Sequence, residues 1–184
     1  MTHKIAAIVG SLRKASFTRK VARAIEALTP ELAFEYVEIG DVDLYNQDLE
    51  ETPPASWVAL RDALRGADGY LFATPEYNRS IPGVLKNAID VASRPYGKSA
   101  FGAGKPAAIV SVSPGAIGAF GANHHLRQCC VFLDLLPMAQ PEAYVGGAAK
   151  LFDDAGAVTN PDTKALLEKF GKSFARWVAL HVKR

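Results

Sequence analysis

Residues 5–18 read Ile-Ala-Ala-Ile-Val-Gly-Ser-Leu-Arg-Lys-Ala-Ser-Phe-Thr, an apolar run that ends at Gly10 and passes into a polar loop. A continuous apolar run of this kind is typical of a strand that is buried on both faces, as in parallel sheets. Beyond the loop, and before Pro30, apolar residues recur at helical spacing: Phe17, Val21, Ala24, Ile25 and Leu28. This segment therefore predicts a strand, a loop and a helix in succession.

The same alternation continues along the chain. Further strands are expected at 34–39, 70–73, 107–112 and 138–145. Helices are expected after Pro53-Pro54, over residues 85–92 and 126–133, and from Asn160-Pro161 onward, where Leu166, Phe170, Phe174 and Val178 share one face. Five strands alternating with five helices predict a doubly wound, five-stranded parallel sheet in a three-layer α/β/α arrangement.

The composition is that of an ordinary globular domain. The chain has 184 residues, of which 49% are hydrophobic and 22% charged, so we expect one domain over residues 1–184. The formal net charge of +2 gives no field strong enough to indicate nucleic acid or a membrane surface as a partner. No stretch approaches the roughly 20 apolar residues that span a bilayer, and no signal peptide is visible, so a cytoplasmic location is expected.

Cysteine and histidine usage gives no sign of a disulfide or a metal site. Cys129 and Cys130 are adjacent, and a bridge between neighbours closes a strained ring, so reduced thiols on a helix are expected. The histidines lack the spacing of metal ligands: His3, His124, His125 and His181. Lys86 and Asp90 lie four residues apart and predict an exposed helical ion pair, and the acidic segment 41–51 predicts a solvated loop.

The loop after the first strand is rich in hydrogen-bond donors. In a doubly wound sheet, ligands bind outside the carboxyl ends of the strands. Here Ser11, Ser16 and Thr18 supply hydroxyls, Arg13 supplies a guanidinium, and the following helix directs free backbone N–H groups to the same point. These features predict a site for a phosphate monoester, and the alternative is an ordinary capped helix with an exposed basic loop.

Two later strand ends are also unusual. Residues 74–83 carry two prolines and place Tyr77 just past a strand, where a stiff loop can hold a flat ring. Residues 111–121 contain glycines that allow the backbone to approach a ligand closely. Each loop alone could be a surface connection, but three such loops at successive strand ends of one sheet favour a common ligand site.

These loops resemble those of the NAD(P)H-dependent FMN reductases, in the branch that includes bacterial chromate and quinone reductases. Residues 10–18 are similar to that family's Gly-Ser-Leu-Arg-Lys-Gly-Ser-Phe-Asn signature, and residues 74–78 to its Thr-Pro-Glu-Tyr-Asn block. Further similarity lies at 44–46, 104–106, 125–128 and 141–142. The family has Gly and Asn where this chain has Ala15 and Thr18, which could strain the loop and weaken its hold on the phosphate.

The resemblance implies a flavodoxin-like fold that binds FMN. It implies that the FMN phosphate is surrounded by five residues of the first loop and the start of the following helix: Ser11, Arg13, Ser16, Phe17 and Thr18. It implies that the isoalloxazine is held, largely through backbone groups, by Pro75, Glu76, Tyr77 and Asn78, and that the third loop approaches the cofactor with Ser113 and Gly115.

The activity that the resemblance implies is hydride transfer from NAD(P)H through FMN to a small-molecule acceptor: a quinone, a flavin, an azo compound or a metal oxyanion such as chromate. No side chain need act as a general acid or base, because the flavin carries the chemistry. A homodimer or homotetramer is also implied, with candidate contacts at 93–97, Arg127 and Glu142. The alternatives are a flavodoxin-like electron carrier without turnover, which the charge of +2 argues against, and a regulatory module that senses a phosphorylated metabolite.

Overall fold

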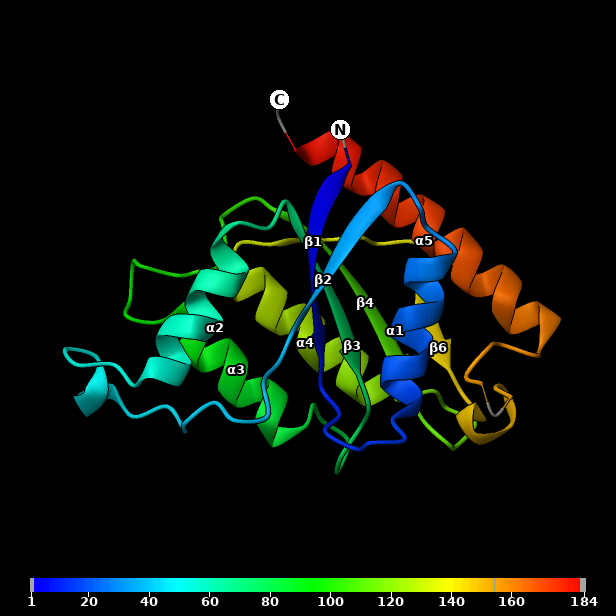
Figure 1. The fold of residues 1–184 in the computed structure, drawn as a ribbon, viewed down its shortest axis with the longest axis horizontal. Coiled ribbons are helices and arrows are strands. Elements are labelled where there is room, and N and C mark those ends of the chain that lie inside the picture. The colour runs from blue at the N-terminus through cyan, green and yellow to red at the C-terminus, as the bar shows by residue number, and fades with distance from the viewer. Residues whose placement is uncertain (1, 154, 183–184) are drawn as a thin grey trace.

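A parallel sheet runs through the middle of the protein, with helices on both of its faces (Figure 1). The structure is a computed structural model and describes residues 2–153 and 155–182. The strands are β1 (His3–Val9), β2 (Leu32–Val37), β3 (Gly69–Thr74), β4 (Pro106–Val112), β5 (Leu136–Pro137) and β6 (Ala143–Val145). Their order is β2-β1-β3-β4-β5, with β6 also paired to β4, and every pairing is parallel. This is the predicted doubly wound arrangement.

The fifth position of the sheet differs from the prediction of one strand at 138–145. Two short strands share it, since β5 pairs with the start of β4 and β6 with its end. Pro137 and Pro141 provide the physical reason, because proline has no N–H to donate and interrupts a strand ladder.

In the part of the chain that the structure describes, three helices cover one face of the sheet and two cover the other. The first group is α2 (Ala55–Arg65), α3 (Gly83–Ser93) and α4 (Phe120–Phe132), and the second is α1 (Phe17–Ala27) and α5 (Pro161–His181). Short 3-10 turns occur at η1 (Gln47–Leu49) and η2 (Ala148–Lys150). On α5 the buried face includes Leu167 rather than the expected Leu166.

Alternate residues of the strands divide the core in two. Ile8 and Phe72 pack under α2, α3 and α4, while Ile5 and Leu71 pack under α1 and α5. All seven residues of β4 are buried, which explains why its sequence is apolar without alternation. Each face of the sheet therefore has its own closed apolar layer.

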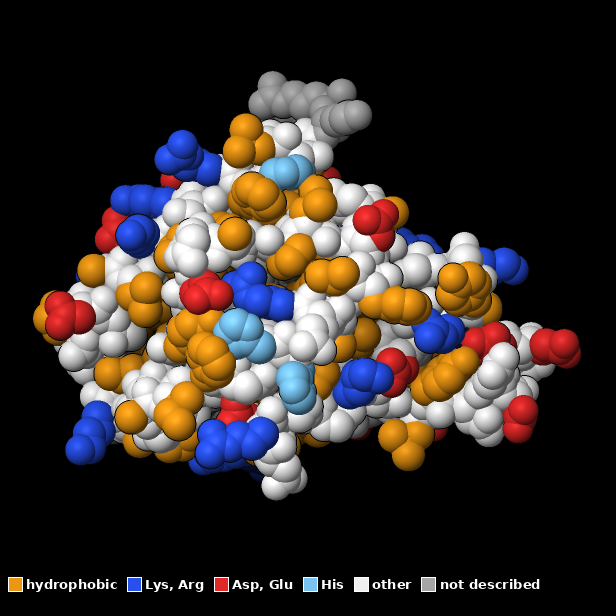
Figure 2. Space-filling model, turned by 180° about the vertical axis from the view of Figure 1, so that it is seen from behind, with side chains coloured by type: hydrophobic (Ala, Val, Ile, Leu, Met, Phe, Trp, Pro, Cys, Tyr) orange, Lys and Arg blue, Asp and Glu red, His pale blue; other side chains and the backbone are white. Residues whose placement is uncertain are grey.

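Charges of both signs are mixed on the face of the molecule that Figure 2 shows. Seen from behind, Lys and Arg side chains alternate with Asp and Glu among hydrophobic ones (Figure 2). None of the helices in the described part of the chain is both long and apolar enough to cross a bilayer.

The carboxyl ends of β1, β3 and β4 lie together at the lower edge of the sheet in Figure 1. The chain leaves this edge through three loops, residues 10–16, 75–82 and 113–119. The parallel register places them side by side, and the candidate site is built from them.

Candidate functional site

The first loop forms a donor-rich cradle at the start of α1. Ser16 caps the helix, because its Oγ accepts a hydrogen bond from the Arg19 backbone N–H at 3.1 Å. The backbone N–H groups of Phe17 and Thr18 lie in the first turn, where a helix offers them no internal acceptor. Arg13 is exposed, with its guanidinium carbon 5.6 Å from the centroid of the Phe17 ring.

Burial holds the three hydroxyl-bearing residues of this loop in place. Ser11, Ser16 and Thr18 are 5%, 2% and 3% exposed, so the cradle is built into the fold rather than placed on a loose surface loop. Ala15 is not among the described residues with positive φ, so the alanine introduces no left-handed strain here.

The second loop contains a tight turn that presents Tyr77. The backbone N–H of Tyr77 donates to the Ser80 carbonyl at 3.0 Å, and the reverse bond is also 3.0 Å. Asn78 and Arg79 have φ angles of 51° and 66°, the geometry of a two-residue hairpin turn. The Tyr77 side chain is 52% exposed and therefore available to a ligand.

The third loop is fixed by backbone bonds to the end of β6 and to η2. Ser113 N–H donates to the Val145 carbonyl at 3.0 Å, and Ala148 N–H donates to the Ser113 carbonyl at 3.1 Å. The Ser113 hydroxyl donates to the Gly115 carbonyl at 2.9 Å. A Cβ at Gly115 would meet only the Ser113 hydroxyl at 3.9 Å, so its backbone borders open space.

A buried polar network, which the sequence analysis missed, supports the third loop from below. The Ser111 hydroxyl donates to the Gly118 carbonyl at 2.7 Å and lies 3.2 Å from Nδ2 of Asn123. Arg127 Nε donates to Oδ1 of Asn123 at 3.1 Å. Ser111 and Asn123 are 0% exposed. The one sequence signal for this network is Ser111, a polar residue within the otherwise apolar run of β4.

A second missed contact joins the second loop to α4. Glu76 is a predicted isoalloxazine residue, but its carboxylate accepts a hydrogen bond from the Ala122 backbone N–H at 2.9 Å. Glycine at 121 permits this approach, because a Cβ there would lie 2.8 Å from the Arg79 carbonyl oxygen. The Glu76 side chain is thus committed to the protein, which leaves the backbone of its loop to face a ligand.

The first two loops enclose a hollow of about 430 Å³. It is lined by Gly10, Leu12, Arg13, Tyr77, Pro82, Gly83 and Val84. The structure therefore brings the predicted residues Arg13 and Tyr77 to one cavity. The other predicted residues lie around the same edge of the sheet without lining this hollow.

The residues at this edge fit a phosphate joined to a flat ring. Residues 10–18 contain no carboxylate and combine a guanidinium, hydroxyls and a helix N-terminus, the donor set that anions require. The hollow beside them has apolar walls and an exposed aromatic side chain, which suits a planar heterocycle. Within residues 2–153 and 155–182, no group of His, Cys, Asp and Glu is arranged to hold a metal ion.

An aromatic cluster lies beyond the third loop. His124 Nε2 lies 3.1 Å from the Tyr144 hydroxyl, and the Phe120 ring lies 4.2 Å from the His124 ring. Burial and the neighbouring Glu142 carboxylate raise the pKa of Tyr144 to about 12. The phenol therefore stays protonated through the physiological range.

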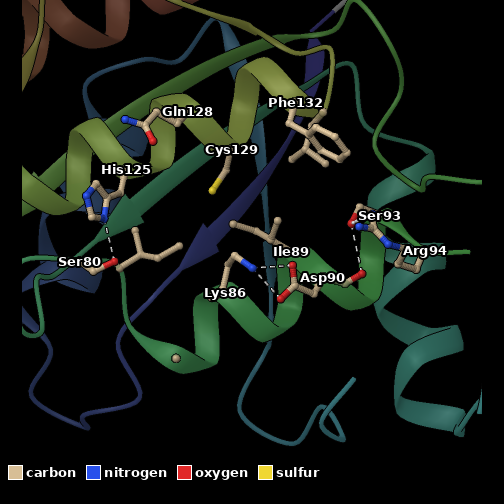
Figure 3. A pocket seen from close by; sticks show the side chains of 13 residues that line it. Ser80, Lys86, Ile89, Asp90, Ser93, Arg94, His125, Gln128, Cys129 and Phe132 are labelled. Carbon is tan, nitrogen blue, oxygen red and sulfur yellow. Dashed lines mark hydrogen bonds and ion pairs between the residues drawn. The ribbon is translucent and has the colours of Figure 1, made fainter. Parts of the chain in front are cut away.

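A larger groove of about 630 Å³ lies between α3 and α4 (Figure 3). Ser80 and His125 face each other across it at 2.9 Å, and Lys86 forms the predicted ion pair with Asp90 at 2.8 Å. Its walls are mainly side chains of α3 and α4, together with Ser80 and Ile81 of the second loop. Despite its size, we place the ligand site at the strand ends, where the anion donors converge.

The fold and these strand-end loops define a flavodoxin-like α/β protein built to bind a nucleotide-like cofactor. Residues 3–150 match the NADPH-dependent FMN reductase family, and the chain belongs to it. The resemblance stated for residues 10–18 and 74–78 is thereby confirmed.

Curated relatives agree over nearly the whole chain. A quinone reductase of Pseudomonas putida is 59% identical over 181 residues, covering 97% of this chain and 96% of that protein. A 2-hydroxy-1,4-benzoquinone reductase of Burkholderia sp is 46% identical, covering 97% of each. Among solved structures, the flavoenzyme NAD(P)H:acceptor oxidoreductase FerB of Paracoccus denitrificans superposes with a TM-score of 0.92 at 40% identity, covering 98% of this chain and 99% of that one.

Family membership confirms the predicted fold, cofactor and enzyme class. The protein is a flavoenzyme oxidoreductase that uses FMN, with NAD(P)H as co-substrate. An electron carrier without turnover is disfavoured, because the family is enzymatic.

Proposed function

We propose that the protein transfers hydride equivalents from NAD(P)H, through FMN, to quinones. The observation that carries this proposal is the convergence of a phosphate cradle and an aromatic-walled hollow at the carboxyl edge of the sheet. Relatives named quinone reductases, at up to 59% identity, support the acceptor class. Free flavins, azo compounds and metal oxyanions such as chromate are further candidate acceptors, because all need the same exposed reduced ring.

The proposed cofactor contacts follow the loops. The FMN phosphate binds at the first loop, the isoalloxazine binds against the second loop, and the third loop approaches the ring or the ribityl chain. The residues proposed to contact FMN are Ser11, Arg13, Ser16, Phe17, Thr18, Pro75, Glu76, Tyr77, Asn78, Ser113 and Gly115.

The protein's part in the reaction is to bind and orient. FMN supplies the chemistry when bound, since it accepts hydride and passes electrons on. The N-terminus of α1 and Arg13 stabilise the dianionic phosphate. Tyr77 shapes the face on which planar molecules stack, and Glu76 keeps its loop tied to α4. No side chain is assigned a proton-transfer step.

The direct experiment is to purify the protein with added FMN, record the flavin absorbance and measure NADPH oxidation with a quinone. We expect bound flavin and steady-state turnover. Colourless protein that takes up no FMN contradicts the proposal. Flavin binding without any NAD(P)H consumption would instead favour the electron carrier.

We also propose that two copies associate through the groove between α3 and α4, giving a homodimer or, with further contacts, a homotetramer. Phe132, which lines the groove, is 67% exposed, and Tyr96, two residues after the lining residue Arg94, is 83% exposed. In a two-fold contact, Lys86 of each copy can face Asp90 of the other. Arg127 and Glu142, 3.9 Å apart, are candidates for a second contact. A monomer by light scattering at micromolar concentration would overturn this.

Residues 1–184 are proposed to form one FMN-binding domain, because both apolar layers pack against the same sheet. A cytoplasmic location is proposed from the two unbridged cysteines. Fractionation of cells that express the tagged protein tests the location.

A further inference from the structure

A groove that the proposed flavin site does not use runs along α1. Its two parts, of about 260 and 350 Å³, adjoin each other, because both are lined by Arg23, Ala155 and Gly156. One wall is α1, and the other is formed by Ala155, Gly156, Ala157 and Val158.

The part of the groove nearer the strand-end loops is basic. Four cations line it, together with the capping hydroxyl: Lys14, Ser16, Arg19, Lys20 and Arg23. Two of the cations are already neutralised, because Arg19 pairs with Glu38 at 2.9 Å and Arg23 with Glu26 at 2.9 Å.

Among the residues that the structure describes, Lys14 and Lys20 are the remaining lining cations of this part. Within residues 2–153 and 155–182, neither Lys14 nor Lys20 has a carboxylate within 4.0 Å. Lys20 Nζ instead lies 5.6 Å from the centroid of the Phe152 ring. Two ammonium groups on one wall of a groove favour a ligand that carries negative charge there.

The far part of the groove is apolar. Its walls include Ala24, Ala27, Leu28 and Val158, with Lys164 at the end. Small and branched apolar side chains facing one another offer a slot for a flat ring. The groove as a whole suits a ligand with a phosphate at one end and a planar heterocycle at the other.

The groove also begins at the proposed FMN phosphate site, because Ser16 belongs to both. A dinucleotide whose nicotinamide lies against the flavin ring can direct its other half past the FMN phosphate. From that point α1 offers about 16 Å of helix, at 1.5 Å per residue. The adenosine half can therefore continue along α1 without leaving the surface.

We propose that this groove binds the adenosine end of NADPH. Lys14 and Lys20 contact the 2′-phosphate, and the adenine lies in the apolar part near Leu28. The assignment rests on the proposed function for the position of the nicotinamide. It gives the enzyme a means of distinguishing NADPH from NADH, since only the former carries the 2′-phosphate.

The test compares the wild type with the variant Lys14→Ala/Lys20→Ala. Calorimetric titration with 2′,5′-ADP is expected to show affinity about fivefold weaker or more in the variant, while affinity for 5′-AMP changes less. The KM for NADPH should rise relative to the KM for NADH. Lys172→Ala, which removes an exposed lysine of α5 paired with Glu168, is the matched control and should leave all values unchanged.

Equal 2′,5′-ADP affinity in the wild type and the double variant overturns the proposal, as does failure of the wild type to bind 2′,5′-ADP. Inorganic phosphate that competes as well as 2′,5′-ADP would show a simple anion site and would also overturn it. Flavin absorbance of the same samples separates the two proposals. If NADPH reduces the bound flavin but 2′,5′-ADP binds the wild type and the double variant equally, only the proposal for the groove is refuted. If 2′,5′-ADP binding depends on the two lysines but the protein holds no flavin, only the proposed flavin site is refuted.

Discussion

The carboxylate of Glu76 lies 2.9 Å from the backbone nitrogen of Ala122 and accepts its hydrogen bond. This contact caps a helix that cannot cap itself, because the N-cap residue of α4 is Ala119, which has a φ of 61° and no side-chain acceptor. A negative charge at a helix N-terminus is also favoured by the helix dipole. The loop that carries Tyr77 is therefore anchored to the helix that follows the third loop, and two walls of the flavin site are joined.

Replacing Glu76 by Ala is expected to lower the free energy of unfolding by about 1 kcal/mol, the usual cost of a lost N-cap. FMN should also dissociate faster, because the second loop loses its tie to α4. Urea denaturation and flavin-fluorescence recovery after dilution measure the two effects. Glu76→Gln keeps an acceptor oxygen and should lie between the wild type and Glu76→Ala.

The matched control for this prediction is Glu31→Ala, which removes an exposed carboxylate outside the three loops. It should change neither the urea midpoint nor the FMN dissociation rate. If Glu76→Ala behaves like Glu31→Ala, the carboxylate does not anchor the loop.

In the wild type the Ser111 hydroxyl donates to the buried Gly118 carbonyl at 2.7 Å, and replacing Ser111 by Ala removes this donor. Leaving that acceptor unsatisfied should cost about 1–3 kcal/mol of stability. The third loop should also hold FMN less tightly. Thermal unfolding and FMN titration measure the effects, and Ser111→Thr, which restores a hydroxyl, should recover part of the FMN affinity. Equal FMN affinity in all three proteins would show that the network does not support the cofactor.

Much of the fold could be predicted from periodicity. The runs at Ile5–Val9 and Ala107–Val112 are apolar without alternation because β1 and β4 are covered on both faces. The N-cap residues Ser16 and Asn160 likewise mark the starts of α1 and α5. These signals are local, so the sequence carries them directly.

The parts that could not be predicted depend on residues distant in sequence. Glu76 and Ala122 are 46 residues apart, and only the sheet order brings them together. The division of the fifth sheet position follows from Pro137 and Pro141, whose effect depends on which β4 residues they face. The α3–α4 groove is likewise formed by side chains from two helices, and no short motif predicts it.

Replacing Arg13 by Ala is expected to weaken FMN binding by about 1.5–3 kcal/mol, because a charge-assisted hydrogen bond to phosphate is lost. Arg13→Lys keeps the charge without the planar fork and should lose less. Fluorescence titration with FMN measures the change, and riboflavin, which lacks the phosphate, should bind all variants alike. Arg65→Ala removes an exposed arginine of α2 and serves as control. Unchanged FMN affinity in Arg13→Ala would mean that the phosphate binds elsewhere.

Alkaline pH should destabilise the protein through the buried thiol of Cys130. Burial raises the pKa of this group from 9.0 to about 12, so between these values the unfolded chain releases a proton that the folded chain keeps. The free energy of unfolding therefore falls as pH rises from about 9, by at most about 1.4 kcal/mol per pH unit from this one group. Urea unfolding at pH 8, 9, 10 and 11 measures this effect, and the free energy of unfolding should decline less steeply with pH in Cys130→Ala than in the wild type. Cys129→Ala, at a half-buried site, is the control and should change this pH dependence less. Parallel slopes for the wild type and Cys130→Ala would show that other groups govern the alkaline transition.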